Sequence, residues 1–152
     1  MSDDVTSVER VIPASASEIF ALIANPRRHH EFDGSGTVQQ AKNSPDQLTL
    51  GSTFGMSMRW GIPYSMVNTV VEFEPDRRIA WQTQPSVGLL KLFVGGRIWR
   101  YVLEPVKGGT KVTESWDISQ ERVKAAVLPL RSKTIDSMTK TLERIERVVT
   151  AS

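Results

Sequence analysis

The chain has 152 residues, of which 39% are apolar and 24% are charged, with Lys+Arg 19 against Asp+Glu 17. This is about the length of one domain and the composition of an ordinary globular protein, which excludes a mainly disordered or collagen-like chain. The net charge of +2 is small, and the arginines are interleaved with carboxylates rather than gathered into a basic stripe. We therefore expect a single domain, residues 1–152, that does not bind nucleic acid.

The chain has no cysteine and two histidines, His29 and His30. Disulfides and thiolate chemistry are excluded, and a metal site is not expected because most zinc sites need about three or four Cys or His ligands. We predict no metal and no cofactor. The first residues lack a signal-peptide pattern, and the most apolar stretch, 87–94, is too short to span a bilayer. The prediction is a cytoplasmic protein without stable membrane insertion.

A strand and two short helices are predicted first. Val5–Ile12 has the apolar pattern of a strand and ends before Pro13. Ser15-Ala16-Ser17-Glu18 is a capping-box pattern, and an apolar helix face follows it. Asn25-Pro26 ends this helix and begins a second one that extends to about Phe32.

Strand patterns then dominate as far as residue 118, with Gly, Pro and Asp in the connections. The predicted strands are Thr37–Lys42, Ser52–Trp60, Tyr64–Glu74, Arg78–Gln84, Arg97–Val106 and Thr110–Ile118. One connection is Gly61-Ile62-Pro63 and another contains Lys107-Gly108-Gly109. Sequential strands with tight turns predict an antiparallel meander.

A long C-terminal helix is predicted from one apolar stripe: Ile135, Met138, Leu142, Ile145 and Val149. Pro129 lies near its start, either as a first-turn proline or at a kink after 121–128. An antiparallel sheet with one buried face needs a cover, and this helix is the only element large enough. The prediction is an α+β fold in which a curved antiparallel sheet of about seven strands wraps on the long helix.

Strand alternation predicts which side chains face that helix. In Ser52–Trp60 the even positions carry the large apolar residues. In the last two strands the inward positions are Trp99, Tyr101 and Leu103, and Val112, Glu114, Trp116 and Ile118. Asn68 faces inward if Met66 and Val70 do, and outward if Val67 and Val71 do; a bulge could switch the faces midway.

Glu114 and Arg97 interrupt the apolar inner faces. A buried carboxylate is costly unless it is paired, hydrogen-bonded or wetted. A two-residue loop, Lys107-Gly108, would place Tyr101 opposite Glu114, and a four-residue loop would make it a diagonal neighbour. Either register allows a Tyr–Glu hydrogen bond, which is either a structural pair or part of a pocket.

The predicted inner face is rich in rings and methionine: Phe54, Met56, Met58, Trp60, Trp81, Trp99, Tyr101, Trp116 and Met138. Such side chains can fill a core. Apolar walls with a few polar groups are also typical of small-molecule sites, and methionine adapts to varied ligands. We predict a partly filled cavity whose ligand contacts these residues together with Asn68, Arg97 and Glu114.

Residues 27–36 hold most of the remaining chemistry. His29 or His30 can titrate near neutral pH, and Asp33 could orient the ring. The alternative is a polar helix and loop with solvated side chains. No phosphate-binding loop, serine nucleophile elbow or zinc-protease motif is present. Residues 87–94 extend the flanking strands, or they form a lip over a cavity mouth or a dimer contact.

The sequence resembles the bacterial polyketide cyclase/dehydrase-like (SRPBCC) proteins, especially actinobacterial ones. These belong to the helix-grip superfamily of START lipid-transfer domains and the birch pollen allergen. The N-terminal half of the resemblance rests on Val11-Ile12-Pro13-Ala14-Ser15, Glu18–Ala24, Asn25-Pro26-Arg27-Arg28-His29, Asp33-Gly34-Ser35-Gly36 and Gly51–Met56. The rest is carried by Val70–Pro75, Arg78-Ile79-Ala80-Trp81, Trp99–Pro105, Gly108–Glu114 and Thr141–Ile145.

The resemblance spans nearly the whole chain and implies a helix-grip fold with a cavity for lipids, polyketides or aromatic compounds. It does not imply one reaction, since fold does not settle function. In a cyclase or dehydratase, Glu114 with Tyr101 and Arg97, or His29 or His30 with Asp33, could move protons at an enolisable ketone. Burial is expected to raise the pKa of Glu114.

Three functions follow as hypotheses. The first is a binding protein, monomer or homodimer, for a hydrophobic small molecule. The second is a cyclase- or dehydratase-type enzyme that uses the same cavity. The third is a protein-interaction module that uses the apolar residues 87–94.

Overall fold

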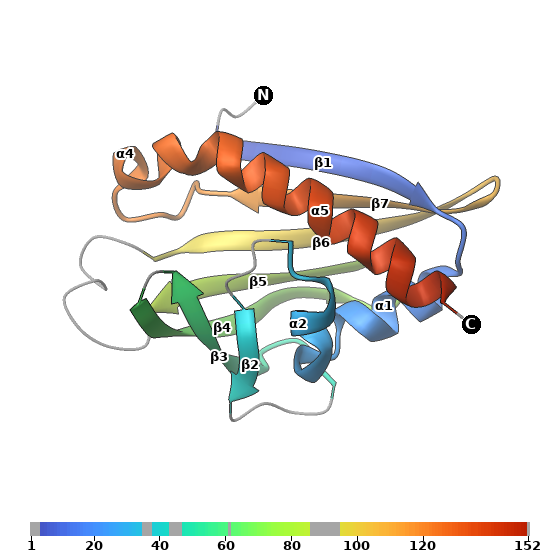
Figure 1. Ribbon diagram of the computed structural model, residues 1–152, viewed down its shortest axis with the longest axis horizontal. Helices are drawn as coiled ribbons and strands as arrows, with labels where there is room; N and C mark the ends of the chain where they lie inside the picture. Colours follow the sequence, from blue (N-terminus) through green and yellow to red (C-terminus); the bar gives the residue numbers. More distant parts are fainter. Residues whose placement is uncertain (1–3, 35–37, 43–46, 61, 86–94, 152) are drawn as a thin grey trace.

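The structure, a computed structural model, describes residues 4–34, 38–42, 47–60, 62–85 and 95–151 (Figure 1). In 38–42, 56–60, 62–65 and 85 it describes the backbone but not the side chains. Within these residues a 7-stranded antiparallel sheet has the order β1-β7-β6-β5-β4-β3-β2, so the first strand lies beside the last. Figure 1 shows α5 across one face of this sheet, which confirms the predicted α+β architecture.

The strands are β1 (Val5–Ile12), β2 (Val38–Lys42), β3 (Thr53–Trp60), β4 (Ile62–Glu74), β5 (Arg78–Pro85), β6 (Arg97–Val106) and β7 (Gly109–Asp117). The helices are α1 (Ala16–Ile23), α2 (His29–Phe32), α4 (Lys124–Val127) and α5 (Arg131–Thr150), with 3-10 turns η1 (Pro26–Arg28) and η2 (Leu128–Leu130). The predicted turn at Gly61-Ile62-Pro63 is wrong in its last two residues, which pair with Trp60 and Arg59. Among the described residues no β5 residue pairs with Pro63, and proline is tolerated at a strand position where no ladder N–H is needed on one side.

Local capping accounts for the two predicted helix starts. The Ser15 hydroxyl accepts a hydrogen bond from the Glu18 N–H at 3.2 Å, and Asn25 Oδ1 accepts one from the Arg27 N–H at 3.1 Å. Pro129 falls within η2, so the chain makes a 3-10 turn between α4 and α5. The Ser15 and Asn25 side chains thus satisfy backbone N–H groups that the start of a helix leaves unpaired.

The apolar stripe of α5 packs on the sheet over most of its length. Met138, Leu142 and Ile145 are buried and Val149 is half-buried, but Ile135 is 36% exposed. Leu142 and Ile145 join the main core, and Met138 packs with Trp116 in a second cluster near η2. Helix α5 contacts β1, β7, α1 and α2, so it bridges the closing strands and the N-terminal helices.

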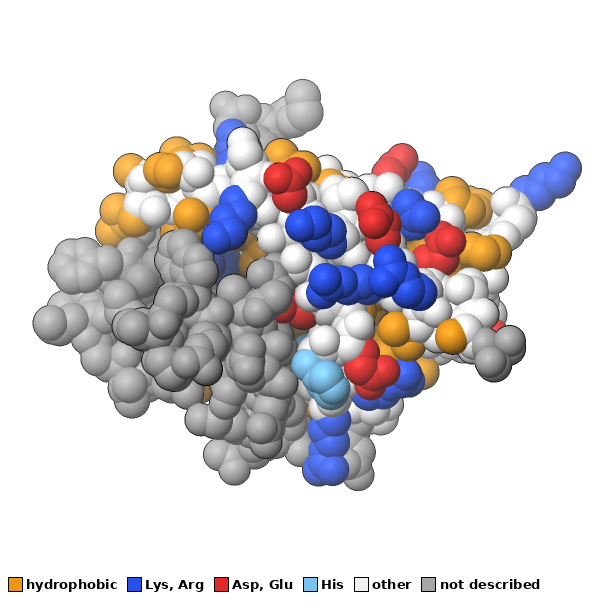
Figure 2. All heavy atoms as spheres, in the orientation of Figure 1, with side chains coloured by type: hydrophobic (Ala, Val, Ile, Leu, Met, Phe, Trp, Pro, Cys, Tyr) orange, Lys and Arg blue, Asp and Glu red, His pale blue; other side chains and the backbone are white. Residues whose placement is uncertain are grey.

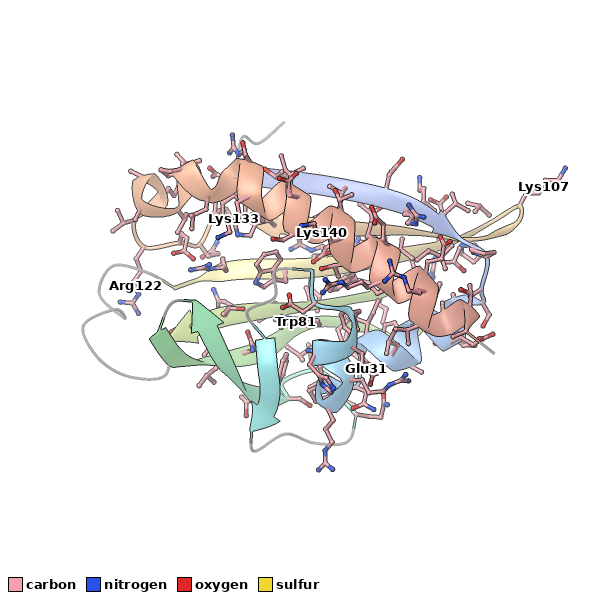
Figure 3. The ribbon with its side chains drawn as sticks, in the orientation of Figure 1. Glu31, Trp81, Lys107, Arg122, Lys133 and Lys140 are labelled. Carbon is pink, nitrogen blue, oxygen red and sulfur yellow. The ribbon has the colours of Figure 1, made fainter. Side chains whose placement is uncertain are left out.

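The outer side of α5 is charged. Figure 2 shows Lys and Arg side chains gathered over this helix, and Figure 3 labels Lys133 and Lys140 along it. Of the helices in the described part of the chain, none has the length and apolar composition needed to cross a membrane.

Candidate functional site

The strand register aligns the helix-facing side chains into rows across the sheet. One row is Val8, Glu114, Tyr101 and Ile79. The next is Thr6, Trp116, Trp99, Trp81 and Val70. A third is Arg97, Thr83, Asn68 and Phe54. The aromatic middle row therefore has polar side chains on both sides.

Tyr101 and Glu114 form the predicted pair. Val106 pairs with Gly109, so Lys107-Gly108 is a two-residue loop and Tyr101 stands opposite Glu114. The Tyr101 hydroxyl donates to Glu114 Oε2 at 3.0 Å. Each of the two residues is 3% exposed, so the hydrogen bond lies in the interior.

The Glu114 carboxyl is held in its neutral form. Burial raises its pKa to about 8, the Tyr101 hydrogen bond opposes this rise, and the charge of Asp33 adds to it. Burial and the adjacent Glu114 raise the pKa of Tyr101 well above its usual value. At pH 7 the pair is therefore a carboxylic acid beside a phenol.

Asp33 links this pair to the N-terminal helices. Its charge acts on Glu114, Tyr101 and His29. The Arg144 guanidinium donates to the Asp33 carbonyl, and the next N–H, that of Gly34, donates to Thr141 Oγ1 at 2.8 Å. A Cβ on Gly34 would lie 2.1 Å from the Ser137 carbonyl oxygen, so only glycine permits this approach to α5. Glu114, Tyr101 and His29, from the two proton-transfer sets predicted separately, thus lie within electrostatic range of one carboxylate, Asp33.

His29 is a buried, neutral ring. Its Nε2–H donates to the Ile23 carbonyl at 2.7 Å. Burial lowers its pKa to about 4, which the hydrogen bond to Ile23 and the charge of Asp33 only partly oppose. The expectation that this ring titrates near neutral pH is therefore wrong. His30 is exposed.

Trp81 lies at the centre of the aromatic wall. Its ring stacks on His29 at 5.0 Å between centroids and forms a T-shaped pair with the Phe54 ring at 5.4 Å between centroids. The Tyr101 ring is tilted against it at 5.6 Å. Figure 3 shows Trp81 near the middle of the sheet, in view between α5 and α2.

A bulge in β4 decides the orientation of Asn68. The register shifts between Val70 and Glu72, so Met66, Asn68 and Val70 face the helix while Val67 and Val71 are exposed. Phe73, beyond the bulge, packs on the core again. Thr83 Oγ1 donates to Asn68 Oδ1 at 2.5 Å, and both residues are buried.

Arg97 has a partner that the sequence analysis missed. The carboxylate of Glu121 accepts hydrogen bonds from the Gly95 N–H at 2.9 Å and the Arg97 N–H at 2.8 Å. Its Oε2 also lies 3.3 Å from Arg97 Nε, and the Glu121 side chain is 0% exposed. Glu121 follows β7 in a segment without regular periodicity, so no sequence pattern identified it.

The other predicted lining residues are placed as follows. Phe54, Trp116 and Met138 are each 1% exposed, and Trp99 is half-buried. Met56, Met58 and Trp60 belong to β3, but their side chains lie outside the described part of the chain, as do residues 87–94. Among the described residues, a pocket of about 40 Å³ lies between β1 and α5 and has room for water only. It is lined by Val8, Glu9, Arg10, Thr139 and Leu142.

Two buried polar atoms on β7 have no hydrogen-bond partner among the described residues: Glu114 Oε1 and Trp116 Nε1. Both side chains lie on the helix-facing side of the strand. Within the described residues no group of three or more His, Asp or Glu side chains is arranged to hold a metal ion. The candidate site is therefore an apolar, aromatic interior with a neutral acid, a phenol and an indole N–H.

The chain has relatives of similar sequence and solved structures of similar fold. The chain is 36% identical over 108 residues to Rv0088, an uncharacterized protein of Mycobacterium tuberculosis, a match that covers 70% of this chain and 44% of that protein. The chain thus spans less than half the length of this curated relative.

Two solved structures share the fold. Protein CV1439 from Chromobacterium violaceum has a TM-score of 0.75 at 13% identity, covering 99% of this chain and 100% of that one. Major latex-like protein 151 from Panax ginseng has a TM-score of 0.73 at 13% identity, covering 97% of each chain. Residues 4–150 match the family described as polyketide cyclase / dehydrase and lipid transport. The chain belongs to this family and has its helix-grip fold, with the Glu114–Tyr101 pair on the side of the sheet that faces the long helix.

Proposed function

We propose that the protein binds an apolar small molecule, such as a lipid, a polyketide or an aromatic compound, between the sheet and α5. The observation that carries the proposal is Glu114, a carboxyl 3% exposed in an aromatic wall with one oxygen unpartnered among the described residues. Such a group costs free energy in a solid core, whereas in a binding site it orients the ligand.

The family supports the same class of ligand, since its description names polyketide chemistry and lipid transport. The aromatic row of Trp116, Trp99 and Trp81 supplies the apolar surface. Burial of ligand surface contributes about 25 cal/mol per Å², so ring and chain area dominates the affinity. In this proposal the whole chain, 1–152, acts as one binding domain.

A fluorescent apolar ketone, 6-propionyl-2-(dimethylamino)naphthalene, tests the proposal. We expect saturable binding with energy transfer from tryptophan, displacement by a bacterial lipid extract, and a co-purified apolar ligand in native mass spectrometry. Trp81→Phe removes lining surface and should weaken binding about fivefold. Val71→Ala truncates a side chain on the outward face, which is 38% exposed, and should leave affinity unchanged. Failure of every apolar compound to bind the folded protein would refute the proposal.

A cyclase- or dehydratase-type enzyme is the second candidate, and the Glu114 pKa of about 8 favours it. A carboxyl that exchanges its proton near physiological pH, beside Tyr101, suits acid–base catalysis at an enolisable ketone. Deuterium exchange of the propionyl α-protons, followed by NMR in D₂O, measures this chemistry. Glu114→Gln should abolish exchange and spare binding. Equal loss of exchange and binding would indicate a structural Glu114.

A further inference from the structure

The two unpartnered atoms of β7 belong to neighbouring inward positions. Glu114 and Trp116 are 3% and 1% exposed, and one residue separates them in the strand. Alternate residues of a strand point to the same side and lie about 7 Å apart. An unpartnered buried polar atom destabilises the folded protein because it has lost its hydrogen bonds to water. A single ligand can therefore contact both atoms and offset part of this destabilisation.

Both atoms are hydrogen-bond donors. The indole Nε1–H of Trp116 can only donate. Glu114 Oε2 already accepts from the Tyr101 hydroxyl. Burial favours the neutral acid, and with Oε2 acting as acceptor the carboxyl proton is on Oε1. The interior thus offers two donors and needs an acceptor.

The surrounding charge selects a neutral acceptor. Asp33 acts on Glu114 and Tyr101 as a like charge. The cation of the neighbouring row, Arg97, already lies 3.3 Å from the buried Glu121 carboxylate. A carboxylate or phosphate is therefore disfavoured at this place. An ammonium group offers only donors, so it cannot accept hydrogen bonds from the Trp116 N–H and the Glu114 O–H. A carbonyl oxygen has two lone pairs and no charge, and it matches both donors.

We propose that Glu114 and Trp116 form the polar end of the binding site and take the neutral carbonyl oxygen of an otherwise apolar ligand. The inference rests on the proposed function and narrows it to ketones, aldehydes and esters. Tyr101 then acts as a positioning residue, since it orients the acid through Oε2 and leaves Oε1 to the ligand.

A matched pair of probes tests the inference. 6-Propionyl-2-(dimethylamino)naphthalene carries the carbonyl, and 6-propyl-2-(dimethylamino)naphthalene differs by its removal. Two neutral hydrogen bonds should make the ketone bind about tenfold more tightly than the alkyl probe. Trp116→Phe should reduce this ratio to about threefold, whereas Val71→Ala, on the outward face of the sheet, should leave the ratio unchanged. Glu114→Gln keeps an N–H donor and should retain the ratio.

Infrared spectroscopy of the ¹³C-labelled carbonyl gives a second readout that needs no variant. The bound ketone should absorb at lower frequency than in an aprotic apolar solvent, because both donors polarise the C=O bond. Equal affinity of the two probes, or an unshifted carbonyl band, overturns the inference while the proposed function stands. Tighter binding of the 6-aminopropyl analogue overturns it too. If neither probe nor any lipid binds the folded protein, the proposed function itself has failed.

Discussion

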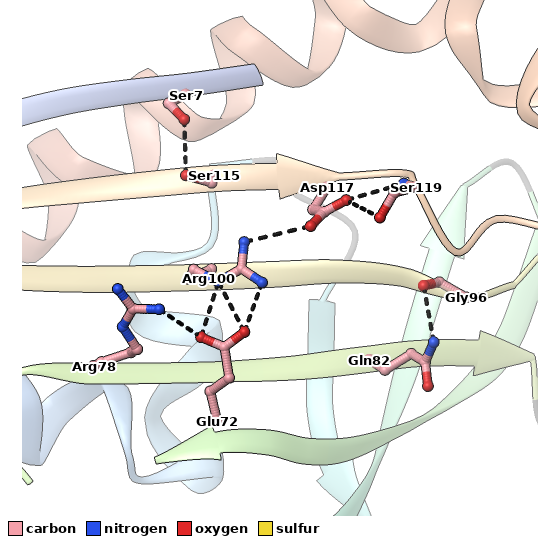
Figure 4. A network of polar contacts seen from close by, with 9 residues as sticks. All are labelled: Ser7, Glu72, Arg78, Gln82, Gly96, Arg100, Ser115, Asp117 and Ser119. Carbon is pink, nitrogen blue, oxygen red and sulfur yellow. Dashed lines mark hydrogen bonds and ion pairs between the residues drawn. The ribbon is translucent and has the colours of Figure 1, made fainter. Parts of the chain in front are cut away.

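Two carboxyl groups on opposite faces of the sheet, Glu72 and Glu114, have opposite surroundings. On the outward face Arg100 bonds both oxygens of Glu72, with its Nη2 at 2.6 Å from Oε2, and reaches Asp117 Oδ2 at 3.4 Å (Figure 4). Arg78 and Ser119 complete the network. On the helix-facing side of the same strands, Glu114 has one phenol and no cation among its bonded partners.

This difference explains the opposite pKa shifts of the two acids. Hydrogen bonding from Arg100 lowers the pKa of Glu72 despite partial burial, so its charge is retained. Burial raises the pKa of Glu114, so its charge is lost. The charge of Glu72 is satisfied by arginines within the protein, whereas Glu114 is a neutral acid on the helix-facing side.

The largest expected effect is the change in protein stability with pH that the titration of Glu114 causes. Between the unfolded value of 4.5 and the folded value of about 8, the native state holds a proton on Glu114 that the unfolded state has released. The free energy of unfolding therefore falls as pH rises through this window. Glu114→Gln removes this titrating group. The unfolding free energy of the variant, relative to wild type, should therefore increase by up to about 5 kcal/mol between pH 4.5 and 9.

Urea unfolding of both proteins across this pH range measures that difference. His29, whose pKa is lowered to about 4, contributes stability that increases up to its unfolded value of 6.5. Both proteins carry His29, so its contribution cancels in the comparison. Tyr101 and Asp33 are the charged or titratable groups that act on Glu114. A constant difference between the two proteins would show that Glu114 is not neutralised by burial.

Removing the inner hydrogen bond should have the next largest effect. Tyr101→Phe leaves Glu114 Oε2 without its donor in the interior, at a cost of about 1–3 kcal/mol in unfolding free energy. Thermal unfolding at pH 6 measures it. The same change should raise the Glu114 pKa further, since the hydrogen bond from Tyr101 opposes the rise that burial causes. A Tyr101→Phe protein as stable as wild type would contradict the pairing.

Breaking the outward network should cost less. Arg100→Met removes one of the two arginine partners of Glu72, whose side chain is 29% exposed and can be rehydrated. We expect a loss of about 1 kcal/mol that shrinks as salt is added, because water and ions screen exposed pairs. Unfolding in low and high salt checks this. A loss larger than that of Tyr101→Phe would reverse the comparison between the faces.

The smallest effect is expected at the rim. Arg10 Nε lies 2.9 Å from Glu146 Oε1, and their side chains are 41% and 30% exposed. Arg10→Gln should change the unfolding free energy by less than about 0.5 kcal/mol. The same urea titration measures this change. A loss of unfolding free energy above about 1 kcal/mol would show that the Arg10–Glu146 pair stabilises the packing of α5 on β1.

Much of the inner face could be predicted because strand alternation is a local property. Trp99, Tyr101, Glu114 and Trp116 face the helix as their spacing predicts. Tyr101 and Glu114 are only 13 residues apart, and the turn residues between them set the register. Asn68 could not be assigned, because a bulge between Val70 and Glu72 changes the alternation without a distinct sequence pattern.

The sequence by itself determined the order of elements, the faces of the strands and the Tyr101–Glu114 hairpin pair, since backbone geometry and short loops dictate these. Only the tertiary structure decided that the charge of Asp33 raises the pKa of Glu114 and that His29 is buried and neutral. It also decided that the Glu121 carboxylate accepts a hydrogen bond from the Arg97 N–H. The contacts that hold Asp33 and Gly34 to α5 join residues 111 and 107 positions apart. No local pattern encodes such pairs, because they form only when the helices pack together over the sheet.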